Sequence, residues 1–450
     1  MSQPKAGVVV VGAGMAGLFA ARRLQELGLQ PLVLESAAEP GGLLAWTRVG
    51  ATDLELFYHH LFGADRLTLG TLKQLDIPVD WRSTSTGFVD SRKEGIARFS
   101  GPQHLLTFSH LALPDRLRLG AALVRVALQW RQSADPAALD HITAQAWMAS
   151  WGGAAIYERF FEPLIVKKFG CETPDISAAW LIGRLGMRAG RSWEGERLGY
   201  PRGGFRSLAF GLTDAVRRSG GEVRTGVRVQ EVVVEDGRVK GVQVTTGADP
   251  ARTFLAADAL VLTPQPRALG SLLAHSGLDA ESERMRRLPY QGTLTVLLGF
   301  ERRLTDYYWL NVMDPGVSFG AIIEHTNFQP AALYEGPVVY LASYPDPGDP
   351  LWQLPDHEIV SRFVAELQRL LPSARGNALR WSRVARCDEA SLIYRTGVAK
   401  LLPPRRAPVP GLYYTGMFRA YPKRPVEKIA VDAYGCAEDV ATDLGLRGGA

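Results

Sequence analysis

The N-terminal part of the chain contains two wholly apolar runs separated by one amphipathic stretch. Residues 8–11 are four successive valines, and residues 31–34 form the second run. Uninterrupted apolar runs of this length are typical of strands buried on both faces of a parallel sheet. Between them, apolar side chains recur at helical spacing at Leu18, Phe19, Ala21, Leu24 and Leu27. The pattern predicts a strand, a helix from Met15 to about Leu27, and a second strand.

Three glycines interrupt this pattern between the first strand and the helix, in the sequence Gly-Ala-Gly-Met-Ala-Gly. We expect Gly12 to allow a tight bend, Gly14 to let a pyrophosphate approach the backbone, and Gly17 to let the helix pack on the strand. The helix N-terminus offers amides and a dipole that favour phosphates. Glu35, directly after the second strand, suits a ribose hydroxyl and would repel the 2′-phosphate of NADP. The unit predicts a dinucleotide site; the alternative is a turn that is merely rich in glycine.

Farther along the chain, the spacing of apolar positions alternates between helical and strand-like. Residues around 55–200 have a mostly helical pattern, and a helix is predicted over 206–218, before Gly220-Gly221. Valines then alternate on both sides of Asp236-Gly237, which is a strong hairpin signal. Residues 257–264 follow as a buried strand that returns the chain to a parallel sheet. The later predicted elements are strands over 292–300, 317–323, 338–343 and 410–416 and helices over about 356–371 and 425–444.

Composition limits the functions open to the chain. Its 450 residues, 46% of them hydrophobic, suffice for two or three hydrophobic cores. The net charge is +5, but basic and acidic residues are interleaved, so no nucleic-acid-binding stripe stands out and no nucleic-acid partner is expected. Cys171, Cys387 and Cys436 lie far apart, without CxxC spacing or a neighbouring histidine. Neither a disulfide framework nor a metal site is therefore expected.

The sequence also bears on where the protein resides. No run reaches about 18 uninterrupted apolar residues, and no signal-peptide pattern precedes the first strand. We therefore expect a cytoplasmic protein, either free or peripheral on the inner face of the cell membrane. Residues 111–131 combine leucines and valines with four arginines. A basic amphipathic helix of this kind either rests on a membrane or packs on the rest of the protein.

Five short motifs are spread from end to end of the chain. They are the glycine turn with Glu35, the pair Gly41-Gly42, the helix start Pro201-x-Gly203-Gly204, the strand at Ala257-Asp258 and the terminal Pro410-Gly411-Leu412-Tyr413-x-x-Gly416. Together they resemble the flavin amine oxidase superfamily, which includes protoporphyrinogen oxidase, phytoene desaturase and monoamine oxidase. The resemblance implies an oxidoreductase with FAD, rather than NAD, as its cofactor.

The resemblance also implies an α/β fold built from two interleaved domains. One is a Rossmann-like FAD-binding domain, a parallel sheet plus a β-meander, expected over residues 1–60, 200–275 and 395–450. The other is an α+β substrate domain, expected over residues 61–199 and 276–394, with a mostly helical first segment. The fold is thus expected to return twice to its cofactor domain.

The family pattern implies which residues contact the cofactor. The glycine turn and Glu35 would hold the ADP half, the strand around Val229 would pass the adenine, and Gly416 with the helix after it would approach the isoalloxazine. Leu43 stands where the family usually has arginine, and the segment after Gly416 lacks the usual short Gly-Ala or Gly-Ser helix start, which leaves the substrate open. The full expected set is Gly12, Ala13, Gly14, Met15, Ala16, Gly17, Glu35, Ser36, Gly41, Gly42, Leu43, Val229, Thr263, Gly416, Met417 and Val426.

Catalytic residues are harder to assign, because a flavin accepts a hydride without an obligatory protein acid or base. We hypothesise that His59 and His60, after the flavin-side loop, and His325, on a substrate-domain strand, line the cavity. The alternative is that each is an ordinary half-buried histidine with one hydrogen bond. Lys423 lies where a cation would stabilise the reduced flavin or bind an anionic substrate, unless it belongs to a solvated helix start. The same alternatives apply to its neighbours Arg419, Arg424 and Lys428.

Three functions are compatible with these features. The preferred one is an FAD-dependent oxidoreductase that takes a hydride from a C–N or C–C bond of a medium-sized, partly apolar small-molecule substrate. The second is a redox-neutral flavin mutase of the UDP-galactopyranose mutase kind, and the third is a flavin-binding scaffold without turnover. Only one GxGxxG follows a strand, so we expect electrons to pass to oxygen, a quinone or another protein rather than through a second NADPH domain. The sequence leaves the substrate and the oligomeric state open.

Overall fold

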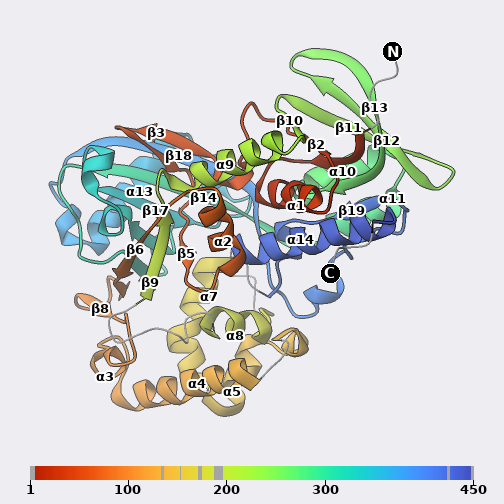
Figure 1. Ribbon diagram of the computed structural model, residues 1–450. Coiled ribbons are helices and arrows are strands. Elements are labelled where there is room, and N and C mark those ends of the chain that lie inside the picture. The colour runs from red at the N-terminus through yellow and green to blue at the C-terminus, as the bar shows by residue number, and fades with distance from the viewer. Residues whose placement is uncertain are drawn as a thin grey trace.

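The computed structural model describes residues 6–132, 136–152, 154–170, 175–186, 196–422 and 426–446. Two seven-stranded sheets dominate these residues, beside a two-stranded and a three-stranded sheet. In Figure 1 one large sheet lies at the upper right with α1 and α14, the other lies at the upper left with α13, and a group of helices lies below both. No helix in this described part of the chain is long and apolar enough to cross a lipid bilayer.

The first large sheet has the order β10-β2-β1-β13-β12-β11, and β19 pairs with β13. Five of its strands are parallel, whereas β12 pairs antiparallel with β13 and β11. The predicted hairpin is confirmed, because Asp236 and Gly237 turn the chain between β11 and β12 with φ of 52° and 70°. The bounds are β1 Ala6–Val11, β2 Pro31–Leu34, β10 Glu222–Arg224, β11 Val227–Glu235, β12 Arg238–Thr246, β13 Asp249–Leu262 and β19 Leu412–Tyr414.

Helices cover this sheet. The three helices predicted near the cofactor are confirmed, with ends within two residues of those expected: α1 is Met15–Glu26, α9 is Gly204–Arg218 and α14 is Val426–Asp443. α1 packs against both α9 and α14, and its buried face includes Leu18, Phe19 and Leu24. Two further helices follow β13, α10 Pro266–His275 and α11 Asp279–Arg286.

The second large sheet has the order β18-β14-β17-β16-β15-β7-β8. The strand predicted over 338–343 and the helix predicted over 356–371 are confirmed, but the strand predicted over 317–323 is confined to residues 321–324. The fourteen-residue strand β18 has no counterpart among the predictions. The bounds are β7 Thr86–Val89, β8 Ile96–Arg98, β14 Tyr290–Phe300, β15 Trp309–Val312, β16 Ala321–Glu324, β17 Val338–Ser343, α12 Pro350–Gln353, α13 Asp356–Leu370 and β18 Leu379–Leu392.

The prediction that residues around 55–200 are mostly helical is wrong for the first third of that span. Short strands alternate there with the single helix α2, and their partners lie far along the chain, since β7 pairs with β15 and both β5 and β6 pair with β9. Tertiary pairing therefore overrides the local pattern. The strands are β3 Trp46–Val49, β4 Thr52–Glu55, β5 Leu61–Phe62, β6 Val79–Thr84 and β9 Glu196–Pro201, and the helices are α2 Arg66–Gln74, α3 His104–Thr107, α4 Leu113–Gln132, α5 Ala144–Gly152, α6 Ala154–Ile156, α7 Glu162–Phe169 and α8 Ala178–Gly186.

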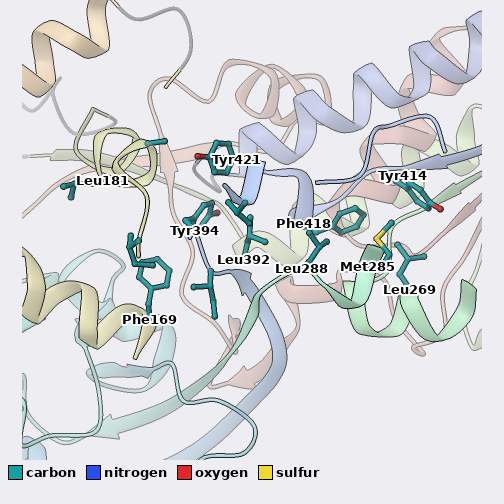
Figure 2. Close-up of a cluster of buried hydrophobic side chains, with 14 of the residues drawn as sticks. Phe169, Leu181, Leu269, Met285, Leu288, Leu392, Tyr394, Tyr414, Phe418 and Tyr421 are labelled. Atoms are coloured by element: carbon teal, nitrogen blue, oxygen red, sulfur yellow. The ribbon is translucent and has the colours of Figure 1, made fainter. Parts of the chain in front are cut away.

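One hydrophobic cluster joins the helical region to the first sheet. Figure 2 shows its side chains in a row, with Phe169 and Leu181 at one side and Met285 and Leu269 at the other. Between them lie Tyr394, Tyr421, Leu392, Leu288 and Phe418. The segment that follows Gly416 is thereby packed against residues of both parts of the molecule.

Candidate functional site

The glycine turn after β1 packs against the side chain of Thr263. Gly12 has a φ of 102°, and a Cβ there would lie 2.4 Å from Oγ1 of Thr263. The Thr263 hydroxyl donates a hydrogen bond to the Val11 carbonyl at 2.7 Å. A Cβ on Gly17 would lie 1.8 Å from the Gly12 carbonyl oxygen. Both positions require glycine, for the bend and for the packing of α1 on β1 that the sequence predicted.

A second glycine turn meets the first one backbone to backbone. Gly41 and Gly14 form a parallel bridge, and the Gly41 amide donates to the Ala13 carbonyl at 2.9 Å. A Cβ on Gly42 would lie 3.3 Å from the Cα of Gly14. Gly14 is also the N-cap of α1 and offers no side-chain cap, and the first turn of this helix, which begins with Met15 and Ala16, contains no acidic residue. The result is a cradle of bare backbone at a helix N-terminus, as a phosphate requires.

Glu35 lies against this cradle. One carboxylate oxygen accepts a hydrogen bond from the Ala13 amide at 2.7 Å, and the other accepts from the Ala37 amide at 2.8 Å. Its backbone carbonyl accepts from the Val227 amide at 2.9 Å, which brings the start of β11 to the same edge of the sheet. Val229 lies two residues farther along β11, whereas Ser36 is exposed. The carboxylate is held where a ribose next to the pyrophosphate would meet it.

The C-terminal motif reaches the same edge from β19. Gly416 has a φ of 153°, and a Cβ there would lie 3.5 Å from the Thr263 carbonyl oxygen. Met417 follows in a short 3-10 helix, and Val426 begins α14. Lys423 and Arg424 lie outside the described residues. Leu43 is half-buried in the 3-10 turn Gly42–Leu44, directly after the second glycine turn.

Arg419 is paired within the protein and is not part of a solvated helix start. Its guanidinium lies 3.0 Å from the carboxylate of Asp432 on α14, which also accepts a hydrogen bond from the Thr415 hydroxyl at 2.8 Å. The Arg419 guanidinium also donates a hydrogen bond to the Pro403 carbonyl. Arg419 therefore fixes the segment after Gly416 to α14, with its charge balanced by Asp432.

The loop over residues 56–60 begins beside the second glycine turn, because the Leu56 amide donates to the Ala45 carbonyl at 2.8 Å. Its two histidines are half-buried. His59 Nδ1 lies 2.6 Å from the Phe57 carbonyl oxygen, and His60 Nδ1 lies 3.1 Å from the Tyr308 hydroxyl. A carbonyl only accepts, so the proton of His59 is on Nδ1. Both histidines thus belong to a loop that begins at the second glycine turn, and their place in the cavity and their catalytic role stay predictions.

Aromatic side chains from separate segments of the chain meet at this loop. The Tyr58 and Tyr344 hydroxyls are hydrogen-bonded to each other, and the Tyr58 ring meets the Trp309 ring edge-on, with centroids 5.0 Å apart. The ammonium of Lys168 lies 3.5 Å from the centroid of the Tyr344 ring, within range of a cation–π interaction. Gln291 on β14 donates to the Lys168 carbonyl at 2.9 Å. We call Tyr58, Trp309, Tyr344 and Lys168 the aromatic wall.

His325 does not line an open cavity, which corrects the hypothesis drawn from the sequence. Its side chain is 3% exposed and is enclosed by tyrosine rings, and its Nε2 lies 2.9 Å from the Tyr334 hydroxyl. Burial lowers the pKa of His325 to about 3. The histidine is therefore neutral and structural, in line with the alternative of a histidine held by one hydrogen bond.

A buried carboxylate, Glu55, shares the neighbour Tyr200 with His325 and was not identified from the sequence. Glu55 is 2% exposed and accepts hydrogen bonds from the Phe205 amide and the Tyr200 hydroxyl, both at 2.5 Å. Its backbone carbonyl accepts from the Tyr340 hydroxyl at 2.7 Å. Burial raises the pKa of Glu55, and burial also raises the pKa of Tyr200. The Glu55 carboxylate caps the first turn of α9, and the Glu55 carbonyl connects β4 to the second sheet. This role depends on tertiary packing, which no local sequence pattern encodes.

No cluster of three or more metal-ligating side chains occurs among the residues that the structure describes. Glu427, one residue after the start of α14, accepts hydrogen bonds from the Leu67 and Thr68 amides at 2.8 and 2.9 Å. The carboxylate thereby caps α2 and fixes it to the first turn of α14.

Comparisons with known proteins agree with this geometry. A family profile described as flavin containing amine oxidoreductase matches residues 15–441. A zeta-carotene desaturase of Capsicum annuum is 24% identical over 464 residues, covering 92% of this chain and 77% of its own. Among solved structures, reduced UDP-galactopyranose mutase has a TM-score of 0.74 at 16% identity and covers 99% of this chain and 97% of its own. Cyclohexylamine oxidase from Brevibacterium oxydans has a TM-score of 0.70 at 16% identity, covering 98% and 100%.

Proposed function

The chain belongs to the flavin-containing amine oxidoreductases, and on this premise we propose that it removes a hydride from a C–C or C–N bond of a medium-sized, partly apolar substrate. It is an FAD-dependent oxidoreductase. The electrons then pass to oxygen, a quinone or a protein acceptor. The observation that carries the proposal is the bare-backbone cradle at Gly14 and Gly42. Loop 56–60, which contributes Tyr58 to the aromatic wall, begins at the second glycine turn.

The residues of the cradle fit FAD. Gly12, Gly41 and Gly42 have positive φ, so a side chain at any of the three would distort the two turns, and Glu35 presents a carboxylate at their edge. When bound, FAD supplies the hydride acceptor. We expect the α1 N-terminus to hold the pyrophosphate and Gly416 with the start of α14 to flank the ring system.

The chemistry of the wall supports a partly apolar substrate. Burial raises the pKa of Tyr308 and keeps its hydroxyl, which lies beside His60, neutral. The Tyr58 and Trp309 rings pack edge-on against each other and supply apolar surface, and the Lys168 ammonium lies over the Tyr344 ring. In this proposal these side chains orient the substrate and exclude water, and no protein acid or base is needed for the hydride step.

Of the two bond types, we favour the C–C bond. The zeta-carotene desaturase, one of several sequence relatives, matches 92% of this chain, whereas the amine oxidase and the mutase are alike in fold at 16% identity. Two of the described arginines, which follow Gly416 and Gly204 in the sequence, are already paired within the protein, and this weakens the case for a sugar-nucleotide substrate. Arg419 is paired with Asp432, and Arg206 lies 3.7 Å from the Asp53 carboxylate, with its guanidinium 4.2 Å from the centroid of Trp46.

The test is anaerobic reduction of the flavin in the purified protein by one substrate class at a time. Polyenes, amines, porphyrinogens and UDP-sugars are each mixed with the oxidised protein, and the flavin absorbance near 450 nm is followed. The proposal expects bleaching by a polyene or another partly apolar compound, together with one desaturated product per flavin reduced. Reduction by dithionite alone, followed by conversion of a sugar nucleotide, would establish the mutase instead. Flavin that no class reduces would support the scaffold.

A further inference from the structure

Helix α4 exposes a row of large apolar side chains to solvent. Leu113, Leu117, Val124 and Leu128 are 57%, 60%, 61% and 49% exposed, and Leu106, just before the helix, is 62% exposed. Among the described residues, eleven large apolar side chains are exposed. Five of the eleven are these, and they lie within residues 106–128. Figure 1 shows α3 and α4 at the lower edge of the molecule, with α3 next to β8 at the end of the second large sheet. Exposed apolar patches of this kind mark interaction surfaces.

The row is a second apolar face of the same helix. At about 100° per residue, the four exposed positions fall within about 60° of one another around the axis. The buried positions Leu119, Ala122 and Val126 lie on the opposite side and are at most 1% exposed. Packing on the rest of the protein therefore accounts for one face of α4 and leaves the other without a function.

Positive charge flanks the exposed row. Around the helix axis, Arg116 lies on one side of the row, and Arg118 and Arg125 lie on the other. From residue 95 to residue 134 the sequence contains five arginines and a single acid, Asp115. This acid is buried in the opposite face, 2.9 Å from Arg118 and 2.6 Å from Arg159. The one acid of this stretch thus lies away from the row, and Arg116 and Arg125 leave its flanks with a net positive charge.

We propose that this face of α4 is a docking surface for an anionic lipid bilayer, with the helix lying in the plane of the interface. Leucine and valine side chains enter the acyl boundary, and the arginines on both sides meet phosphate headgroups. A second copy of the chain fits less well, because a two-fold contact along the row brings like-charged arginines of the two copies together. An anionic bilayer accounts for both features of this face, the apolar row and its basic flanks.

The test is flotation of the full-length holoprotein with vesicles of phosphatidylcholine alone or with phosphatidylglycerol added. We expect binding to the anionic vesicles that weakens with salt. The double variant Leu117→Gln with Leu128→Gln should bind about tenfold more weakly. The matched control, Leu333→Gln with Leu401→Gln, also replaces two exposed leucines, 41% and 40% exposed, and should bind like the wild type.

A second pair of variants separates charge from apolar insertion. Arg125→Gln should reduce the preference for anionic vesicles, whereas Arg228→Gln, an exposed arginine on β11, should not. Flavin content and thermal unfolding of each variant report whether it folds. The proposal is overturned if the folded wild type does not float with anionic vesicles, or if the Leu117 and Leu128 double variant floats equally well. A dimer in sedimentation that this double variant dissociates, without flotation, would assign the face to a second copy instead.

Discussion

The cofactor cradle and the aromatic wall are built in opposite ways. The cradle is made of backbone, with Gly14 and Gly41 bridged directly and no side chain between the two turns. The wall is made of side chains from separate segments, since Tyr58 and Tyr344 are 286 residues apart. A backbone cradle tolerates almost no substitution, whereas a side-chain wall is remodelled by single changes. The comparison explains why the cofactor is easy to assign and the substrate is not.

The largest effect should come from filling the cradle. Gly17→Ala places a methyl group 1.8 Å from the Gly12 carbonyl oxygen, so α1 must move off β1. We expect a loss of at least about 3 kcal/mol in the free energy of unfolding and loss of bound FAD. Thermal unfolding and the FAD-to-protein ratio measure both. The control is Gly70→Ala, an exposed site in α2 with no atom within 4 Å, which should be neutral or stabilising by up to about 1 kcal/mol.

A smaller effect is expected where β4, α9 and the second sheet meet. Glu55→Gln keeps the shape but replaces one of two oxygen acceptors by an NH₂ group, at a cost of about 2–3 kcal/mol. Because the folded protein holds the pKa of Glu55 above its value in the unfolded chain, this group contributes less stability as pH rises above about 4.5. The deficit of the variant, measured by chemical denaturation, should therefore shrink with rising pH. A deficit that grows with pH would contradict the account.

His325 should show the reverse dependence on pH. Its folded-state pKa of about 3 lies below the value of about 6.5 for an unfolded chain, so the unfolded state binds an extra proton between these values. From pH 7 to pH 5 this group removes about 2 kcal/mol from the free energy of unfolding of the wild type. His325→Gln should lack this loss, whereas His357→Gln, on the exposed side of α13, should retain it. Equal pH profiles for His325→Gln and the wild type would contradict the buried, neutral assignment.

The smallest expected effect concerns catalysis at loop 56–60. His60→Ala removes the contact with the Tyr308 hydroxyl, and His59→Ala removes the contact with the Phe57 carbonyl. We expect each to slow anaerobic flavin reduction about tenfold, equivalent to about 1.4 kcal/mol, at unchanged FAD content. His325→Gln should change this rate less than about threefold. Unchanged rates in both loop variants would remove the two histidines from the substrate site.

The parts of the site that the sequence predicts are those encoded locally. The glycine turn and its strand lie within ten residues, and the Asp236-Gly237 turn specifies its own hairpin. Lys168 on α7 and Tyr344, directly after β17, meet only in the finished fold, and β18 forms by pairing with β14 rather than from a local alternation. Glu55 and His325 carry no local signal either, because burial in the finished fold determines their protonation.

Titration of the apoprotein with FAD and with FMN tests the cradle most directly, because FMN lacks the adenosine half that Glu35 and the start of β11 are placed to hold. The account predicts one FAD bound per chain, with an affinity at least about tenfold higher than that of FMN, and a loss of most of this preference in Glu35→Gln. Equal affinity for FAD and FMN, or an unchanged preference in Glu35→Gln, would contradict it.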